Sequence, residues 1–243
     1  FVEADADEAE REGLDPSVLQ AMSGEGERRV DIRESGLGYE VQPAGAQKTG
    51  FYLDQRENRR RVAAWASGRR VLSAYCYTGA FEVAAARGGA TEILGLDASE
   101  PALVQARRHH ELNGTSVPVE YRRGHAPDLL RKLRDEGRSF DLVILDPPRF
   151  VSNRAQKPKG LRAYKDINLL GMKLLAPGGI LATFSCSGLV GPEDFQDVIR
   201  WAAVDAKRET RILDWRGQPA DHPILATFPE SAYLKGVIAR VDV

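Results

Sequence analysis

Two strand-like segments of the chain end in side chains that could react with a nucleobase. Cys186 follows the apolar run Ile180–Phe184, and the motif Asp146-Pro147-Pro148 follows the apolar run Leu142–Leu145. A thiolate is a strong nucleophile, and an acid on a proline-stiffened loop can exchange protons with base nitrogens. The pattern therefore indicates Cys186 and Asp146 as catalytic residues for methyl transfer to a nucleobase carbon.

Cytosine C5 is an example of such a carbon, because it is not nucleophilic enough to take a methyl group unaided. A thiolate that adds to C6 makes C5 an enamine carbon, which can attack a methyl donor. Polar neighbours, Ser185 and Ser187, favour the nucleophile over a buried structural cysteine at Cys186. Cys76, the second cysteine, is predicted to have a packing role.

The segment after Asp146 could hold the base and the RNA backbone. Phe150 could stack on an extruded base, or it could be a core aromatic residue. Residues 149–165 carry no acid, and with Pro158 and Gly160 they resemble a loop. We interpret this segment as a mobile basic flap over the RNA backbone, with a merely solvated loop as the alternative. Its cations are Arg149, Arg154, Lys157, Lys159, Arg162 and Lys165.

Alternating strand-like and helix-like segments must position these residues. The predicted strands are Val71–Tyr75, Glu92–Leu96, Val119–Arg122, Leu142–Leu145 and Ile180–Phe184, followed by Arg211–Trp215 and Tyr233–Val241 as an antiparallel pair at one sheet edge. The predicted helices are Asn58–Ala66, Phe81–Arg87, Pro101–Leu112, Pro127–Asp135, Tyr164–Leu175 and Asp194–Ala206. This alternation predicts an α/β fold: a Rossmann-like, mostly parallel seven-stranded sheet with helices on both faces. A small β-hairpin, Arg29–Arg33 with Tyr39–Gln42, is expected before it.

The first two strands of this sheet end in a candidate cofactor site. The loop Tyr75–Phe81 keeps only Gly79 of a dinucleotide fingerprint, which argues against NAD. Asp97 ends the second strand, where a carboxylate can accept hydrogen bonds from both ribose hydroxyls of an adenosine. A tight turn with a helix N-cap is the alternative interpretation of these two signals.

The composition of the chain is typical of a globular protein. The chain has 243 residues, 42% hydrophobic and 28% charged, as in globular domains. No apolar run approaches the ~18 residues of a bilayer span, so no membrane partner is expected. Two cysteines and four histidines, none at metal-ligand spacing, predict a cytoplasmic protein without a metal. The net charge is −1, but residues 1–15 alone carry −6, which leaves +5 on the remainder and suits an RNA partner.

In order, these motifs resemble the class I S-adenosylmethionine-dependent methyltransferases, and more narrowly the family that methylates C5 of cytosine in large-subunit ribosomal RNA. The resemblance covers residues 28–243. It rests on Lys48–Arg59, Tyr77–Phe81, Asp146–Phe150, Tyr164–Leu170, Phe184–Gly188, Asp221-His222-Pro223 and Tyr233–Gly236. It implies S-adenosylmethionine as cofactor and a cytosine of 23S ribosomal RNA as substrate.

The resemblance also implies a set of site residues. Those expected to bind the cofactor are Gln55, Arg56, Tyr75, Tyr77, Thr78, Gly79, Ala80, Phe81, Asp97, Ala98, His125, Ala126 and Asp146. Those expected to bind the substrate are Pro147, Pro148, Arg149, Phe150, Tyr164 and Lys165. His125 stands where relatives carry an acid for the adenine amino group, and His109 replaces a frequent asparagine.

The resemblance divides the chain into a linker and hairpin (1–47) and a methyltransferase domain (48–243). Family members carry an N-terminal PUA domain, which we expect to precede this chain, and a homodimer is compatible with the pattern.

Two alternative functions stay open. Methylation of guanine nitrogen (N7 or N2) needs no thiol, and a non-catalytic RNA-binding module could retain the same fold.

Overall fold

The computed structural model describes residues 29–42 and 50–243, which belong to two compact units, Phe1–Leu53 and Asp54–Val243. The first unit contains an antiparallel hairpin, β1 (Val30–Glu34) and β2 (Leu37–Val41). Ser35 and Gly36, with φ of 52° and 79°, form the two-residue turn that such hairpins favour. The predicted hairpin is therefore confirmed, while the acidic segment 1–15 and the link 43–49 lie outside the described residues.

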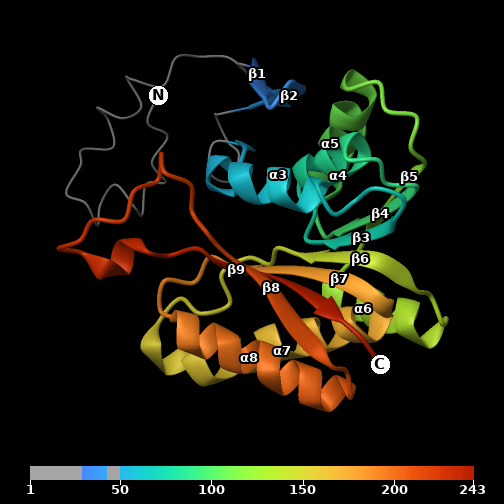
Figure 1. Cartoon of the computed structure of the whole chain (residues 1–243). Coiled ribbons are helices and arrows are strands. Elements are labelled where there is room, and N and C mark those ends of the chain that lie inside the picture. Colours follow the sequence, from blue (N-terminus) through green and yellow to red (C-terminus); the bar gives the residue numbers. More distant parts are fainter. Residues whose placement is uncertain (1–28, 43–49) are drawn as a thin grey trace. The chain divides into compact units, whose positions relative to one another are not determined.

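The second unit is built on a seven-stranded sheet, as predicted (Figure 1). Its strands are β3 (Arg70–Ala74), β4 (Glu92–Asp97), β5 (Val119–Arg123), β6 (Phe140–Leu145), β7 (Leu175–Ser185), β8 (Thr210–Gly217) and β9 (Lys235–Val241). Their order is β5-β4-β3-β6-β7-β9-β8. The first five run parallel, and β9 lies antiparallel between β7 and β8.

Helices cover both faces of this sheet. In Figure 1, α3 (Arg56–Ala63), α4 (Ala80–Arg87) and α5 (Glu100–Leu112) lie on one face, and α6 (Ala126–Asp135), α7 (Lys157–Leu174) and α8 (Pro192–Ala206) lie on the other. Three short 3-10 helices, Leu53–Gln55, Arg154–Gln156 and Pro229–Ser231, complete the described elements. No helix in the described part of the chain has the length and hydropathy to cross a bilayer.

The strands are apolar because both of their faces are covered. On β3, Leu72 faces the larger core under α6, α7 and α8, while Val71 faces the core under α3 and α4. On β6, Val143 and Ile144 divide in the same way between the two cores. This rigid two-faced sheet fixes where each strand ends, and so where the candidate site residues lie.

Two of the predicted elements need correction. The basic segment is not a loop throughout, because α7 begins at Lys157 instead of Tyr164. Pro158 occupies the first turn, where its missing N–H costs nothing. Gly160 lies so close to Val151 and the Phe150 backbone that a Cβ atom there would meet the Val151 side chain at 2.3 Å. The last two strands pair antiparallel at the edge as predicted, but the later strand, β9, is the inner one.

Candidate functional site

The parallel strands β3, β4, β5, β6 and β7 end at one edge of the sheet, where ligands bind in folds of this class. The residues that follow them directly are Tyr75, Ala98, Gly124, Asp146 and Cys186, with Asp97 as the last residue of β4. The strand ends that the sequence singled out therefore share one edge. We call this edge the strand-end site.

The loop after β3 is held in an unusual backbone conformation. Tyr75 and Tyr77 have φ of 65° and 48°, and Gly79 has φ of 78° at the N-cap of α4. The amides of Tyr75 and Cys76 both donate to the carbonyl of Leu96, at 2.8 and 3.0 Å. These two hydrogen bonds hold the start of the loop against β4, next to the strand-end site.

Asp97 is fixed in place by backbone amides. Its Oδ2 accepts from the amide of Tyr77 at 2.9 Å, and its Oδ1 accepts from the amide of Ser99 at 2.9 Å. A carboxylate oxygen has more than one acceptor position, so both oxygens can also receive hydroxyl donors. A preorganised acid beside the loop fits the two ribose hydroxyls of an adenosine.

His109 on α5 contacts the backbone of the loop after β3, a role that the sequence did not predict. The side chain on α5 is fully buried. Its Nδ1 lies 2.7 Å from the carbonyl oxygen of Thr78, and its Nε2 lies 3.0 Å from Nε2 of Gln105. The i, i+4 spacing from Gln105 was visible in the sequence, but the partner 31 residues upstream was not.

Asp146 belongs to a chain of hydrogen bonds that reaches β8. Gln55 Nε2 donates to Asp146 Oδ1 at 2.8 Å. The buried Asn58 donates to Gln55 Oε1 at 2.6 Å, and it accepts from Nε of Arg216 at 3.1 Å. These bonds orient the Gln55 amide, which in turn orients the Asp146 carboxylate. Asn58 is a positioning residue that the sequence did not single out.

Cys186 lies next to the Asp146-Pro147-Pro148 loop. Its Sγ is 4.0 Å from the carbonyl oxygen of Pro147, and its side chain is partly exposed. Ser187, directly after it, is fully buried and shares a hydrogen bond of 2.9 Å with the hydroxyl of Tyr164. The sheet edge thus brings the thiol and the acid together, while Ser187 and Tyr164 hold the loop.

The second cysteine has different surroundings. Cys76 is buried beside Leu103, Ala106 and Tyr121. Burial raises the pKa of its thiol well above the ordinary value. This position agrees with a packing role for Cys76.

Three of the residues expected at the site are buried or paired within the fold. Tyr164 is fully buried. Phe81 is also buried and stacks on Phe184, with ring centroids 5.4 Å apart. Lys165 forms an ion pair with Asp205 of α8, half-way along α7 and away from the strand-end site. These contacts are internal to the fold, and the expected ligand contacts of these residues stay predictions.

Arg56 and His125 are engaged by neighbouring acids. Arg56 forms an ion pair of 2.7 Å with Asp221, which raises its pKa. His125 caps α6 and lies 2.9 Å from Asp128, with 70% of its side chain exposed. His125 lies two residues after the end of β5, and its ring contacts Asp128 in the first turn of α6.

The remaining expected residues surround the strand-end site. Phe150 is partly buried and packs on Tyr164, with ring centroids 4.7 Å apart. Arg149 and Pro148 are exposed, Pro147 is buried, and the loop residues Thr78 and Ala80 lie beside Gly79.

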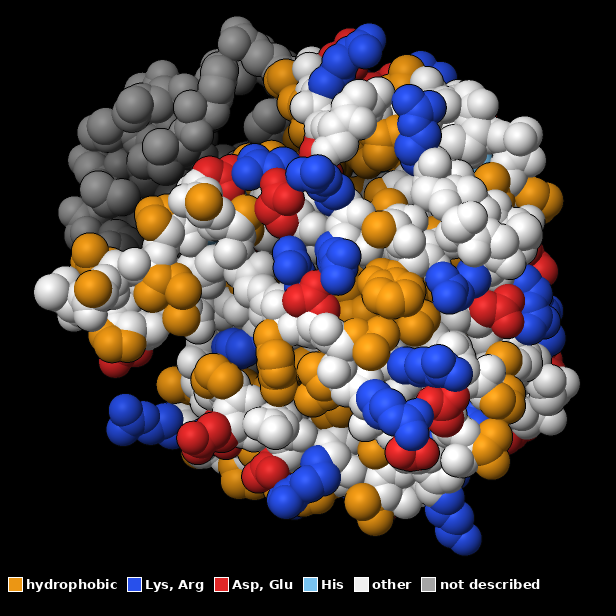
Figure 2. Space-filling view, in the orientation of Figure 1, with side chains coloured by type: hydrophobic (Ala, Val, Ile, Leu, Met, Phe, Trp, Pro, Cys, Tyr) orange, Lys and Arg blue, Asp and Glu red, His pale blue; other side chains and the backbone are white. Residues whose placement is uncertain are grey.

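Of the cations in 149–165, Lys157 pairs with Asp194 at 2.7 Å, whereas Arg154, Lys159 and Arg162 are exposed. On the face in Figure 2, Lys and Arg side chains are scattered, with acidic side chains beside many of them.

Glu82 is a third acid near this site, and it too was not predicted. It lies in the first turn of α4 and is fully buried. Burial raises its pKa to about 7; the charges of Asp97 and Asp146 contribute to this rise, and Ser73 opposes it. The charges of Asp97 and Asp146 both act on Glu82, so three acids lie near this edge of the sheet.

The raised pKa of Glu82 makes stability depend on pH. Between about pH 4.5 and 7 the folded chain holds a proton that the unfolded chain has lost, so the free energy of unfolding falls as pH rises through this window. We expect Glu82→Gln to be more stable than the parent by roughly 2–3 kcal/mol at pH 8, and about equal to it at pH 4. Urea unfolding at both pH values measures this, and equal stabilities at pH 8 would contradict it.

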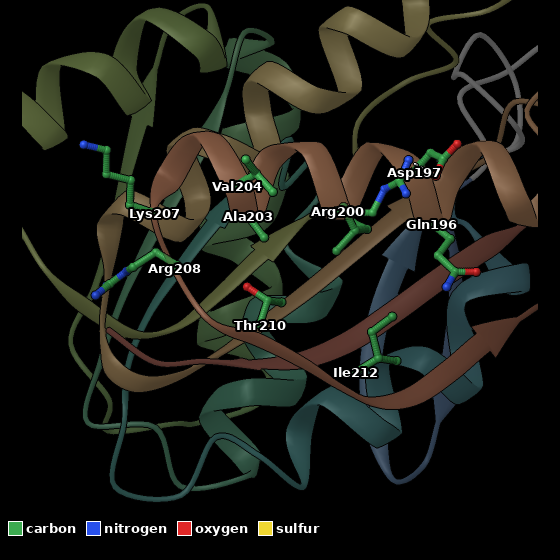
Figure 3. A pocket seen from close by; sticks show the side chains of 10 residues that line it. Gln196, Asp197, Arg200, Ala203, Val204, Lys207, Arg208, Thr210 and Ile212 are labelled. Atoms are coloured by element: carbon green, nitrogen blue, oxygen red, sulfur yellow. Dashed lines mark ion pairs between the residues drawn. The ribbon is translucent and has the colours of Figure 1, made fainter.

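A separate groove lies away from the strand-end site (Figure 3). It has a volume of about 540 Å³ and runs between α8 and β8. Its lining includes Ala203, Ile212 and the ion pair Arg200–Asp197 of 2.9 Å. None of the residues proposed for catalysis lines it, so it is not the reaction site.

The known proteins that are similar to this chain and are described below are all methyltransferases. A family model described as S-adenosylmethionine-dependent methyltransferase matches residues 11–223. "Ribosomal RNA large subunit methyltransferase I" of Shewanella frigidimarina is 45% identical over 243 residues, which cover 99% of this chain and 61% of that protein. The protein of the same name in Erwinia tasmaniensis is 44% identical over 239 residues, 98% of this chain and 60% of its own. The chain thus spans about three fifths of the length of these relatives.

Solved structures agree on the fold. A protein from Streptococcus mutans, described as a SAM-dependent methyltransferase, has a TM-score of 0.80 at 25% identity, over 90% of this chain and 57% of its own. SMU.776, solved in complex with SAH, gives the same values. A tRNA (uracil-54, C5)-methyltransferase of Pyrococcus abyssi shares the fold with a TM-score of 0.56 at 23% identity, over 89% of this chain and 45% of its own.

Proposed function

The chain belongs to the S-adenosylmethionine-dependent methyltransferase family, and from this premise we propose that it methylates C5 of a cytosine in 23S ribosomal RNA through a cysteine adduct. The observation that carries the proposal is the thiol of Cys186, 4.0 Å from the Pro147 carbonyl of the acid-bearing loop. The name of the two relatives supports a ribosomal RNA substrate. The chain spans 61% of the length of such a relative, so the activity of the whole relative enters here as a proposal.

The strand-end site suits the cofactor of this family. Asp97 would accept the ribose hydroxyls, and the backbone of the loop through Gly79 would face the rest of the nucleoside. The Asp97 carboxylate would provide a negative charge on the cofactor side of the site. When bound, S-adenosylmethionine supplies the methyl group, and the residues of this chain orient both reactants.

The proposed reaction assigns one step to each catalytic residue. The Cys186 thiolate bonds to C6 of the extruded cytosine while protonated Asp146 gives its proton to N3, so the C5–C6 π electrons make C5 an enamine carbon. C5 would then bond to the methyl carbon of the donor while the bond from that carbon to the sulfonium sulfur breaks, and the sulfur would keep the electron pair and leave as a neutral thioether. A base removes the C5 proton, the electrons of that bond re-form the C5–C6 double bond, and sulfur leaves as thiolate. N3 returns its proton to Asp146.

Neighbouring groups keep these residues in place. Gln55 donates to one Asp146 oxygen, so the carboxyl is oriented before the base arrives. Phe150, at the end of the same loop, provides a partly buried aromatic surface on which an extruded base could stack. The exposed cations Arg149, Arg154 and Lys159 are available to phosphate groups.

The direct test is the identity of the product. Unmodified 23S ribosomal RNA is incubated with the chain and tritiated S-adenosylmethionine, digested, and analysed by nucleoside mass spectrometry. We expect label in 5-methylcytidine. Label in an N-methylguanosine would replace the proposal by the guanine-nitrogen reaction, and cofactor binding with no labelled nucleoside would favour a non-catalytic module or a requirement for the rest of the protein. Repeating the assay with a full-length protein separates these last two outcomes.

A further inference from the structure

Lys235 is a buried cation at the strand-end site that the proposed reaction leaves without a role. It is the first residue of β9 and only 7% exposed. Its Nζ donates to the carbonyl of Ser187 at 2.7 Å and to the carbonyl of Tyr233 at 2.7 Å. Two of its three N–H groups are thereby fixed.

Lys235 contacts both chain neighbours of Cys186. Across the β7–β9 ladder, Lys235 is the Cα partner of Ser185, the residue before the cysteine. Its ammonium group bonds to the carbonyl of Ser187, the residue after the cysteine. The antiparallel insertion of β9 next to β7 therefore anchors the ammonium group to the residues that flank Cys186, and the charge of Cys186 acts on it.

No described acid forms an ion pair with Lys235. The charged and titratable groups that act on it are Cys186, Asp194 on α8, and Arg149 after β6. Asp194 already pairs with Lys157 at 2.7 Å and accepts from the amide of Gly191 at 2.7 Å. Burial lowers the pKa of Lys235 to about 8, and the negative form of Cys186 opposes this shift.

A buried ammonium group is costly unless it is paired with a negative charge. A thiolate is the form of cysteine that attacks carbon, and a neighbouring lysine lowers the pKa of a thiol. We propose that Lys235 is the cation that stabilises the thiolate of Cys186, an inference that rests on the proposed role of this cysteine as nucleophile. The thiol proton leaves to solvent, the ammonium group remains protonated, and the sulfur keeps the electron pair that bonds to C6.

The alternative is that Lys235 only ties two carbonyl groups together. This structural role predicts a loss of stability in Lys235 variants but no change in the ionisation of Cys186. The two readings therefore differ in a quantity that needs neither RNA nor cofactor.

The experiment uses the Cys76→Ala chain, in which Cys186 is the sole cysteine. Thiolate absorbance at 240 nm and the rate of alkylation by iodoacetamide are followed against pH. We expect a midpoint well below the ordinary thiol pKa of about 8.5. Adding Lys235→Met should raise this midpoint by about one unit or more and slow alkylation at pH 7 about tenfold, whereas Lys235→Arg should keep it low. Lys173→Met, which removes an exposed lysine of α7, is the matched control and should leave the midpoint and the alkylation rate unchanged.

Two results would overturn the inference. One is a midpoint near 8.5 in the Cys76→Ala chain itself, which needs no lysine variant and so is independent of whether Lys235→Met folds. The other is an unchanged midpoint in a Lys235→Met chain whose circular dichroism matches the parent. Failure of the proposed function is separate: a Cys186→Ala chain that still forms 5-methylcytidine removes the nucleophile, whatever the thiol midpoint is.

Discussion

Replacing Cys186 by alanine is expected to abolish methylation while leaving the affinity for S-adenosylmethionine unchanged. Without sulfur at C6, cytosine C5 has no enamine character, so the rate should fall on the order of 10³-fold or more. Cofactor binding should persist, because the proposed adenosine contacts come from Asp97 and the loop through Gly79. Transfer from tritiated S-adenosylmethionine to ribosomal RNA measures the first quantity, and calorimetry measures the second.

A trapping experiment sharpens this prediction. In RNA with 5-fluorocytosine at the target, the C5 position has no proton to lose, so a covalent protein–RNA adduct should accumulate in the parent chain and be absent in Cys186→Ala. Cys76→Ala is the matched control, since that thiol is buried in a packing cluster and should be dispensable for the adduct. A Cys186→Ala chain that methylates at nearly the parental rate would refute C5 chemistry and favour the guanine-nitrogen reaction.

Gly79→Ala is expected to cause the second large loss, this time in cofactor binding and stability together. Gly79 has φ of 78°, and a Cβ atom there would lie 2.8 Å from the Cβ of Ala106 and 2.9 Å from the Tyr121 hydroxyl. A left-handed alanine alone costs roughly 1–2 kcal/mol, and relief of the contact must displace the loop or α5. We expect a loss of roughly 2–4 kcal/mol in the free energy of unfolding and at least about a tenfold weaker affinity for S-adenosylmethionine.

Gly68→Ala separates the two causes. Gly68 has a similar φ of 71°, but a Cβ atom there would meet no atom within 4 Å. This control should show the backbone penalty without the contact and without a change in cofactor affinity. Chemical unfolding and calorimetry on both variants test the prediction, and equal affinities for the cofactor would show that the loop tolerates the side chain.

The fold was predictable because local signals and burial agree along most of the chain. Strands buried on both faces are continuously apolar, as in β3 and β6, and stop signals such as Gly88-Gly89 and Asn113-Gly114 end helices where predicted. The start of α7 could not be predicted, because Pro158 and Gly160 usually indicate a loop. Only the packing of Gly160 against Val151 explains why a glycine is required inside that helix.

The place of a candidate site residue was predictable only where that residue ends a strand or follows it directly. Asp97 ends β4, Asp146 and Cys186 follow β6 and β7, and a parallel sheet brings such positions to one edge. His109 and Asn58 act through partners 31 and 158 residues away, at Thr78 and Arg216, so no local pattern marks them. The buried positions of Tyr164 and Phe81 also depend on tertiary packing, which composition and spacing do not contain.

The place of β9 in the sheet has a consequence for synthesis on the ribosome. A chain is made from its N-terminus, and β8 emerges before the strand that must separate it from β7. Until Lys235–Val241 has been translated, the outer edge of β7 has no partner, and such an edge invites pairing with other chains. The loop of Cys186, the proposed nucleophile, therefore gains the Lys235 ammonium group on its Ser187 carbonyl only when β9 has been added to the sheet.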